Sequence, residues 1–368
     1  MTAAQHHVVP AQALRAGTDP ARPWWHTRLL CVGRDGVVSD AMISSLETEL
    51  LEGDLLVLND AATLPASFRA RLRGRDIEVR LAAARTSFGR EAVDEATSSF
   101  PATWTVVLFG EGDWRTPTEH RPAPPVAAIG DELDLGSGLR AIVRARHAVS
   151  PRLVDVELSR CGAGLARAFY ALGAPIQYSY HRAPLRLADV QTPYAARPWA
   201  MEMPSTGRPL HWPLLERLRA RGVELAWLTH AAGISASGDP DLDASLPLPE
   251  RYSVPSETMR AVYEARRAGH RVVAVGTTVV RALESAAMGV LDGITAIRLG
   301  CPNAHCRLRV VDAILTGIHS PGESHYELLG AFADRDTLDR AHAHAVHAGY
   351  LAHEHGDLML LQLSATKP

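Results

Sequence analysis

The chain has 368 residues, a formal net charge of −3, and 46% hydrophobic and 21% charged residues. This composition is that of an ordinary globular protein long enough for two domains. It excludes a globally basic nucleic-acid-binding chain, while a local basic patch would still suffice for tRNA. No apolar run approaches the roughly 18 residues of a membrane helix, and no N-terminal signal pattern is present, so we expect a cytoplasmic protein without a membrane partner.

The cysteines lie scattered along the chain and form no CxxC pair, which favours a reducing compartment. One cluster, Cys301-x-x-x-His305-Cys306, has the residue types of a zinc site but lacks a second ligand pair nearby. A structural zinc is therefore the minor alternative at this place, and we expect no metal cofactor.

The first part of the chain predicts strands of an α/β sheet. Residues 1–24, rich in Ala, His and Pro, are expected to form a loose arm. A strand is predicted over residues 28–32, and Leu-Leu-Val-Leu at residues 55–58 predicts a second, buried strand. That strand ends in two polar side chains, Asn59 and Asp60.

A different pattern follows over residues 68–160. Short runs that alternate apolar and polar residues, such as those at residues 77–81 and 153–158, are separated by turn-rich and Pro-rich segments. Such alternation is typical of strands with one buried face. Its repetition at this spacing predicts a small antiparallel barrel or sandwich.

Helical and strand patterns alternate again in the second half, as expected for an α/β domain. Residues 223–229 predict a strand, and His230 stands at its carboxyl end. The helices are predicted at residues 165–172, 213–221 and 256–268.

The most informative unit is the run R-V-V-A-V-G-T-T at residues 271–278. It predicts a buried strand, a tight turn at Gly276 and a helix capped by Thr277 or Thr278. A helix N-terminus beside a strand end offers free N–H groups to a carboxylate, phosphate or ribose hydroxyl, and Arg281 would add a charge about one turn later. The same turn also occurs in ordinary βα units, so this motif alone does not define a site.

Residues 274–286, A-V-G-T-T-V-V-R-A-L-E-S-A, closely resemble a family segment, A-V-G-T-T-S-V-R-T-L-E-S-A. The family is that of the S-adenosylmethionine:tRNA ribosyltransferase-isomerases of the queuosine pathway. Residues 53–60, G-D-L-L-V-L-N-D, and residues 356–360, G-D-L-M-L, are also similar to segments of that family. The resemblance extends from about residue 28 to residue 361, with departures in several polar loops, such as Ala61-Ala62 in place of Thr-Arg.

This resemblance implies both a fold and a reaction. The fold is an α/β main domain with an inserted small antiparallel β-barrel domain. We place the barrel at residues 65–162 and the donor-binding main domain at residues 1–64 and 163–368. The family moves the ribosyl part of S-adenosyl-L-methionine (SAM) to a 7-aminomethyl-7-deazaguanine base of tRNA and releases adenine and methionine. Neither pattern nor resemblance indicates an oligomeric state.

Such chemistry needs a base for the proton beside the sulfonium, a proton donor for the leaving adenine, and polar groups that hold the carboxylate and ribose. The resemblance, together with the position of strand ends, supplies candidates. The predicted donor-binding residues are Gly276, Thr277, Thr278, Arg281, Glu284 and Asp60. The predicted acid–base residues are His211, His230 and His319, since imidazole titrates near working pH.

Each of these residues also has a structural alternative. Any of the three histidines can be a hydrogen-bonded structural residue, and Glu284 can be an i,i+3 partner of Arg281. We expect Arg281→Ala to weaken donor binding more than it disturbs folding. A further group of histidines near the C-terminus predicts a solvated helix face, with a metal site as the minor alternative. Its members are His342, His344, His347, His353 and His355.

The departures in the polar loops leave two other functions open. The segment after Pro321 has Glu323 where the resemblance implies no acid, and a Lys of the family is lost nearby. Because tRNA binding depends on phosphate contacts, a SAM-using enzyme with a small-molecule acceptor is one alternative. A non-catalytic SAM-binding protein on the same scaffold is the other.

Overall fold

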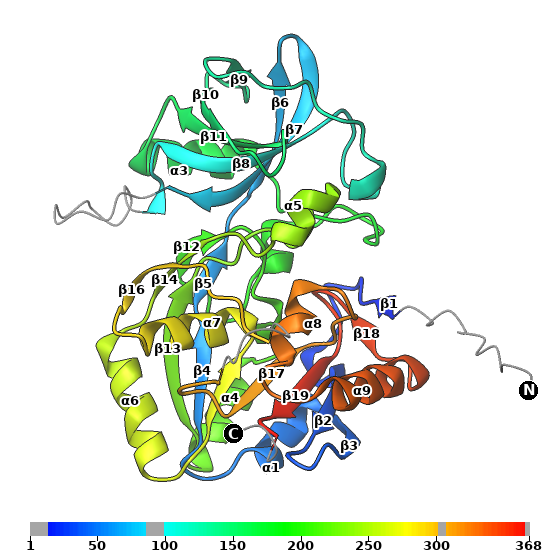
Figure 1. Cartoon of the computed structure of the whole chain (residues 1–368), viewed down its shortest axis with the longest axis vertical. Helices are drawn as coiled ribbons and strands as arrows, with labels where there is room; N and C mark the ends of the chain where they lie inside the picture. The colour runs from blue at the N-terminus through cyan, green and yellow to red at the C-terminus, as the bar shows by residue number, and fades with distance from the viewer. Residues whose placement is uncertain (1–13, 86–98, 301–306, 365–368) are drawn as a thin grey trace, which may run out of the picture.

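The structure is a computed structural model that describes residues 14–85, 99–300 and 307–364. Over these residues the chain forms a mixed sheet covered by helices and, at one end of it, a closed antiparallel barrel (Figure 1). The predicted fold class, an α/β domain with an inserted β-barrel, is therefore confirmed. The segment Cys301–Cys306, on which the zinc alternative rests, lies outside the described residues.

The main sheet has nine strands over the described residues, and four neighbouring strands in its centre run parallel. Parallel neighbours bring their carboxyl ends to one edge of the sheet, where ligands of α/β folds bind. In sheet order the strands are β16 (Asp292–Thr295), β14 (Glu250–Ser253), β13 (Glu224–His230), β4 (Leu55–Asn59), β15 (Val272–Val275), β17 (Ala313–Gly317), β19 (Leu358–Gln362), β2 (Arg28–Val32) and β3 (Val38–Met42).

Both faces of this sheet are buried, which explains the continuous apolar runs of its central strands. Along β4, Leu55 and Val57 belong to one hydrophobic cluster, while Leu56 and Leu58 belong to a second cluster on the opposite face. The helices that contribute to the first cluster are α6 (Ser256–Arg267), α7 (Thr277–Ala286), α8 (Ser324–Leu329) and α9 (Arg335–His347), and those that contribute to the second are α1 (Leu46–Glu49) and α4 (Trp212–Ala220).

The barrel closes because β9 pairs with both β6 and β10. Its order is β10 (Arg140–Arg146), β11 (Leu153–Leu158), β8 (Thr103–Phe109), β7 (Arg75–Ala84), β6 (Ser67–Leu72) and β9 (Glu132–Asp134). One helix, α3 (Gly162–Leu172), adds Phe169 to the barrel core, where its ring lies 4.9 Å from Phe68 and 5.4 Å from Trp104. The predicted domain limits at residues 65 and 162 stay a prediction.

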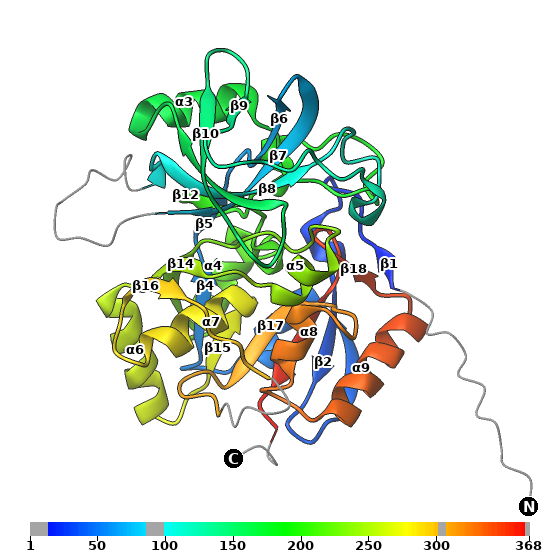
Figure 2. The same cartoon turned by 45° about the horizontal axis from the view of Figure 1, so that its top comes forward.

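The barrel stands at the carboxyl edge of the parallel strands. From the end of β4 the chain runs through β5 (Ala61–Thr63), which pairs with β12 (Arg197–Ala200), directly into β6. Figure 2 shows β5 and β12 between the barrel and the main sheet. The short helix α5 (Pro240–Ser245) lies on the same side, in the segment that follows β13. A ligand at the strand ends is thus covered by the barrel side of the molecule.

Two predictions about the ends of the chain are wrong in part. The expected loose arm includes β1 (Arg15–Ala16), which pairs in parallel with β18 (Leu351–Ala352). The expected solvated histidine face holds for His347, which is exposed on α9, but His355 lies beyond that helix and is 0% exposed. His355 lies between α9 and β19, where residues from distant segments bury it. One of them is His181, whose ring centroid lies 5.5 Å from that of His355.

No helix of the described residues is long and apolar enough to cross a membrane. Within residues 14–85, 99–300 and 307–364, no group of three or more His, Cys, Asp or Glu side chains is arranged to hold a metal ion.

Candidate functional site

The turn between β15 and α7 is the centre of the candidate site. Gly276 has φ +92° and ψ 158°, a conformation that L side chains rarely adopt, so the turn requires glycine. Its N–H donates to the carbonyl of Leu315 on the neighbouring strand at 2.8 Å, which fixes the strand end against β17. The first N–H groups of α7 follow directly on this glycine, and at a helix N-terminus such groups lack intrahelical partners and suit an acceptor group.

Asn59, at the end of β4, ties three segments together at this edge. Its amide group donates to Thr278 Oγ1 at 3.3 Å and to the carbonyl of His230 at 3.0 Å. Its oxygen accepts from the backbone N–H groups of His230 at 2.9 Å and of Ala61 at 3.1 Å. The ends of β4 and β13 and the start of α7 are thus held in one arrangement by a single buried side chain.

Asp60 follows in the chain, and its Oδ1 accepts from the hydroxyl of Thr229 at 2.5 Å. Burial raises the pKa of this carboxyl, against the lowering effects of Thr229 and Arg197. Tyr194 lies close enough for the Asp60 charge to raise its own pKa, after burial as the main cause. Asp60 is therefore a half-buried acid beside a phenol, at the end of a central strand.

Two buried hydroxyl groups near this edge have no hydrogen-bond partner among the described residues. They belong to Thr192 and Tyr194, which are 5% and 8% exposed. A Cβ at Gly207 would lie 2.2 Å from the Tyr194 hydroxyl, and a Cβ at Gly276 would lie 3.6 Å from Thr206 Oγ1. The loop that carries Thr206 and Gly207 thus links the unpartnered hydroxyls to the β15–α7 turn. Since buried polar groups are normally hydrogen-bonded, these hydroxyls are places for ligand or water oxygens.

A second cluster of side chains lies at the end of β17. His319 Nε2 is 3.0 Å from Thr316 Oγ1, and its Nδ1 is 3.5 Å from a carboxylate oxygen of Glu323. The ring of His319 stacks on that of His325 with centroids 4.9 Å apart. His325 Nδ1 in turn lies 3.0 Å from Thr277 Oγ1, the first residue of α7. The cluster therefore joins the predicted His319 to the predicted Thr277 through His325.

Burial shifts the pKa of two members of this cluster, His325 and Glu323. Burial, followed by the neighbouring His319, lowers the pKa of His325 to about 3, so His325 is neutral at physiological pH. Burial opposes ionisation of Glu323, but the contact with His319 lowers the pKa of its carboxyl overall. Glu323, His319 and the neutral His325 thus form a row that leads to Thr277 at the N-terminus of α7. Such a series suits a general acid or base that is oriented by an acid.

Arg281 and His230 meet at a buried acid, Glu250. The Arg281 guanidinium donates to Glu250 Oε2 and to the carbonyls of Ile297 and Thr295, at 3.2 and 3.3 Å. His230 Nε2 lies 3.6 Å from the same carboxylate oxygen, and in the part of the chain that the structure describes neither ring nitrogen of His230 has a hydrogen-bond partner. Burial, and then the charge of Arg281, lowers the pKa of His230, so this histidine is neutral. Arg281 is thus engaged within the protein, and a ligand carboxylate would have to compete with Glu250 for it.

Glu284 has a structural environment. Its carboxylate accepts from the backbone N–H groups of Arg309, Val310 and Val311, at 2.7 to 3.1 Å. The predicted alternative of an i,i+3 pair with Arg281 is wrong, because Glu284 instead fixes the segment that leads into β17. Its proposed contact with a donor stays a prediction.

His211 lies in another environment. It precedes α4 as its N-cap, and its ring stacks on Trp24 of η1 (Trp24–His26) with centroids 5.9 Å apart. Burial, followed by the charge of Arg208, lowers the pKa of His211. The structure therefore brings Gly276, Thr277, Thr278, Asp60 and His319 to one edge and joins Arg281 to His230 beside it, through Glu250. The ring of His211 instead packs against Trp24 of η1.

Four further members of the site were not predicted as site residues, although Glu323 was noted as a departure from the family pattern. His325, Glu323, Glu250 and Tyr194 reach it from loops or strand starts that lie far from residue 276 in the chain. Their position in the chain could have indicated Glu323 and His325, because both lie in the segment that follows β17, as His319 does.

The fold and this site together define an α/β enzyme scaffold with a ligand edge at the end of parallel strands. The family described as "Queuosine biosynthesis protein" matches residues 9–361 of the chain. The S-adenosylmethionine:tRNA ribosyltransferase-isomerase of Thermus thermophilus is 32% identical over 98% of this chain and 99% of its own length. That of Sorangium cellulosum is 33% identical over 91% of this chain and 92% of its own length.

A solved structure, that of S-adenosylmethionine tRNA ribosyltransferase from Thermotoga maritima, is 25% identical, with a TM-score of 0.49, over 94% of this chain and 96% of that chain. The chain belongs to the queuosine biosynthesis protein family. It is an enzyme of the transferase and isomerase kind, and the resemblance seen in its sequence is confirmed.

Proposed function

We propose that this protein moves the ribosyl part of SAM to a 7-aminomethyl-7-deazaguanine base of tRNA, with release of adenine and methionine. The names of the relatives, which cover nearly the whole chain, support the reaction class. The observation that carries the proposal is the convergence at the β15–α7 turn of a helix N-terminus, unpartnered hydroxyls and the His319 cluster.

The donor would be held at the start of α7. The free N–H groups after Gly276 and the hydroxyls of Thr277 and Thr278 suit a carboxylate or ribose hydroxyls, because the helix dipole favours negative charge there. Asp60 and the Tyr194 hydroxyl, which lies beside Gly207, offer further polar contacts at this edge. These groups are fixed by Asn59 and by the backbone of β17 before any ligand binds, which lowers the entropy cost of binding.

The acid–base work is assigned to the His319 cluster. His319 touches Glu323 on one side and His325 on the other, so its ring orientation is set by two neighbours. Removal of a proton beside a positive sulfur and protonation of a leaving purine both fall within the range of an imidazole. His230 is the second candidate for this role, because it is neutral and its ring nitrogens have no hydrogen-bond partner within residues 14–85, 99–300 and 307–364.

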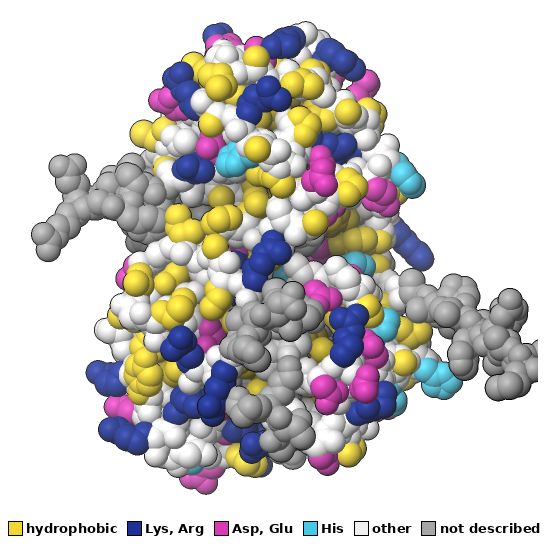
Figure 3. Space-filling view, in the orientation of Figure 1, with side chains coloured by type: hydrophobic (Ala, Val, Ile, Leu, Met, Phe, Trp, Pro, Cys, Tyr) yellow, Lys and Arg dark blue, Asp and Glu magenta, His cyan; other side chains and the backbone are white. Residues whose placement is uncertain are grey.

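A small-molecule acceptor is the second candidate function. The formal net charge of −3 and the acid Glu323 beside His319 favour it, since tRNA binding depends on contacts between cations and phosphates. On the face shown in Figure 3, Lys and Arg side chains lie interspersed with acidic ones over both the barrel and the α/β part. Local clusters of arginine, rather than overall charge, must therefore provide any RNA contact.

The experiment that tests the proposal follows adenine and methionine by mass spectrometry. The purified protein is incubated with SAM, with and without tRNA that carries the 7-aminomethyl-7-deazaguanine base. Adenine release that requires this tRNA supports the proposal. SAM binding without adenine release that depends on this tRNA indicates the small-molecule alternative.

A further inference from the structure

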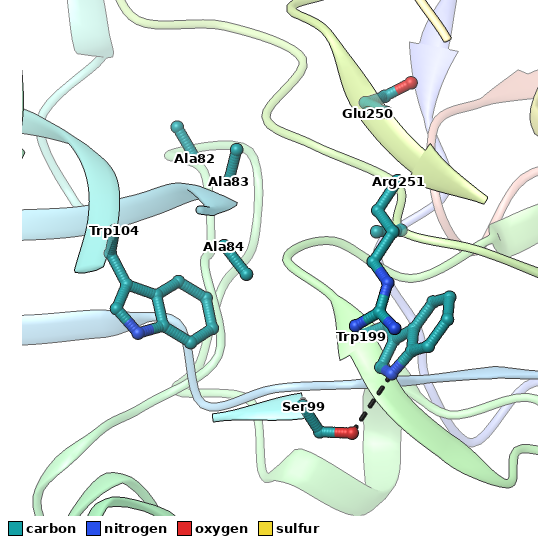
Figure 4. Close-up of a pocket in the computed structure, with 9 residues that line it drawn as sticks. Ala82, Ala83, Ala84, Ser99, Trp104, Trp199, Glu250 and Arg251 are labelled. Carbon is teal, nitrogen blue, oxygen red and sulfur yellow. Dashed lines mark hydrogen bonds between the residues drawn. The ribbon is translucent and has the colours of Figure 1, made fainter. Parts of the chain in front are cut away.

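A pocket separate from the β15–α7 turn lies where the barrel meets the main sheet. Its barrel wall consists of Ala82, Ala83 and Ala84 at the end of β7, together with Trp104 of β8, and its other wall carries Trp199 of β12 (Figure 4). Pockets at such junctions are common ligand sites, and alanines leave space between large aromatic residues. The predicted donor-binding residues line no part of this pocket.

Trp199 is held as a flat platform on the second wall. Its Nε1 donates to Ser99 Oγ at 3.1 Å, and the residue is 7% exposed, so the indole ring is fixed by a hydrogen bond and by packing. The guanidinium of Arg251 lies over this ring at 3.7 Å from its centroid. Figure 4 shows the two groups on the same side of the pocket, opposite Trp104. A planar cation thus already occupies a stacking position on the indole.

The pocket is small while Arg251 holds that position. Its accessible volume is about 20 Å³, which is room for about one water molecule. A ring that stacks on Trp199 must therefore displace the guanidinium, which is carried on a long side chain. Arg197 lies 5.7 Å from the centroid of the same ring, so a base stacked on Trp199 would have two arginine side chains beside it, the residue type that commonly contacts phosphates.

The end of the pocket next to the main sheet carries an acid. Glu250 lines the pocket and is 6% exposed, and it accepts from the N–H of Gly233 and from the Arg281 guanidinium. Burial raises the pKa of its carboxyl, an effect that Arg281 opposes. An additional cationic group at this place would meet a carboxylate that is short of solvent. Glu250 also connects the pocket to α7, the helix at which we place the donor.

We infer that this pocket binds the nucleobase of the acceptor, with Trp199 as the stacking surface and Glu250 facing its aminomethyl group. The inference rests on the proposed function. An aromatic platform, arginines at the mouth and a buried acid suit a base that carries a cationic amine and an RNA phosphate. The adenine of the donor fits less well, because it carries no cation for Glu250 and SAM has no phosphate for the arginines.

The test compares Trp199→Ala, Trp199→Phe and a matched control. The control is Trp114→Ala, because Trp114 also carries an arginine over its ring, Arg115 at 5.3 Å, and lines no part of the pocket. The readouts are the KM for the modified tRNA in adenine release and the Kd for SAM by calorimetry.

We expect Trp199→Ala to raise the KM for tRNA about tenfold or more, the usual effect of removing one base-stacking residue. Trp199→Phe is expected to retain most of the affinity, Trp114→Ala to match the parent protein, and the Kd for SAM to be unchanged in all three. An unchanged KM in Trp199→Ala overturns the inference. A loss of SAM affinity in Trp199→Ala with an unchanged KM for tRNA also overturns it, since the pocket would then hold the donor.

A second measurement separates this inference from the proposed function. Equilibrium dialysis with the free base 7-aminomethyl-7-deazaguanine needs no turnover and no tRNA. Binding to the parent protein that Trp199→Ala abolishes supports the pocket even if adenine release fails. If the protein turns over the tRNA but Trp199→Ala still binds the free base, the inference about the pocket is overturned and the proposed function stands.

Discussion

At the scale of single residues, the site depends on how a few buried polar groups are paired. His319 is oriented by Glu323 and His325, whereas the ring of His230 is buried and finds no hydrogen-bond partner among the residues that the structure describes. Such contrasts between neighbouring titratable groups are typical of acid–base sites. Arg281 belongs to the same pattern, because its charge is matched by Glu250 inside the protein.

Replacement of His319 tests the acid–base assignment. His319→Asn keeps a polar group of similar size but removes the titratable ring, so tRNA-dependent adenine release should fall about 100-fold or more. His347→Asn is the control, because His347 is an exposed histidine of α9. Release by His319→Asn within threefold of the parent rate would exclude His319 from this role.

Arg281→Ala is expected to destabilise the protein, in contrast to the expectation from sequence. The substitution leaves the Glu250 carboxylate buried without its partner, which typically costs about 3 kcal/mol or more in the free energy of unfolding. Urea unfolding measures this loss. The double variant Arg281→Met with Glu250→Gln should recover most of the lost stability. If Arg281→Ala alone is as stable as the parent, Arg281 and Glu250 do not form a stabilising buried pair.

These residues also show where the sequence analysis reached its limit. Arg281 and His230 were recognised as site candidates from local patterns, but their common partner Glu250 lies at the start of another strand. His325 reaches Thr277 across 48 positions of the chain. Contacts between residues so far apart in the chain depend on tertiary packing, which hydrophobic periodicity and turn motifs in the sequence do not predict.

At the scale of elements, the βα unit around Gly276 is the best-predicted part of the protein. The strand expected over residues 271–275 is β15 (Val272–Val275), and α7 (Thr277–Ala286) begins directly after the glycine. Local composition was sufficient here because a buried apolar strand, a glycine turn and an amphipathic helix each have a clear sequence pattern. The alternating strands of the barrel were predictable for the same reason, although the closure through β9 was not.

Gly276→Ala tests whether the geometry of this turn serves the donor. Its φ of +92° should cost an alanine about 1–2 kcal/mol in stability. Gly289→Ala is a matched control, because Gly289 follows α7 with φ +104° and has no atom within 4 Å of an added Cβ. We expect similar losses of stability in urea unfolding, but weaker SAM binding by calorimetry only for Gly276→Ala. Equal SAM affinities in the two variants would count against a donor site at the turn.

At the scale of the whole molecule, distant segments meet between the barrel side and the end of the chain. Tyr180, which follows the barrel in sequence, donates its hydroxyl to Glu354, and its ring stacks on His353 with centroids 4.4 Å apart. His181 lies 3.8 Å from the same carboxylate. Burial opposes ionisation of Glu354, but His181 and Tyr180 lower its pKa to about 2.

This contact makes stability depend on pH. Because the pKa of Glu354 is lower in the folded protein than its ordinary value of 4.5, its stabilising contribution is full above pH 4.5 and is lost as the pH falls toward 2. Glu354→Gln should therefore lose about 2 kcal/mol relative to the parent at pH 6 and less at pH 3. Urea unfolding of both proteins at the two pH values measures the loss of stability. An equal loss at pH 6 and pH 3 would show that Glu354 does not stabilise the fold as a carboxylate.

The central claim is that the carbon skeleton of the donor's ribose, and not its methyl group, reaches the tRNA. The most direct measurement uses two SAM samples, one labelled with ¹⁴C in the ribose and one in the methyl group, each incubated with the protein and tRNA carrying 7-aminomethyl-7-deazaguanine. We predict that the ribose label enters the RNA and that the methyl label leaves with methionine. Methyl label in the RNA, or ribose label that stays in solution while adenine is released, would contradict the account.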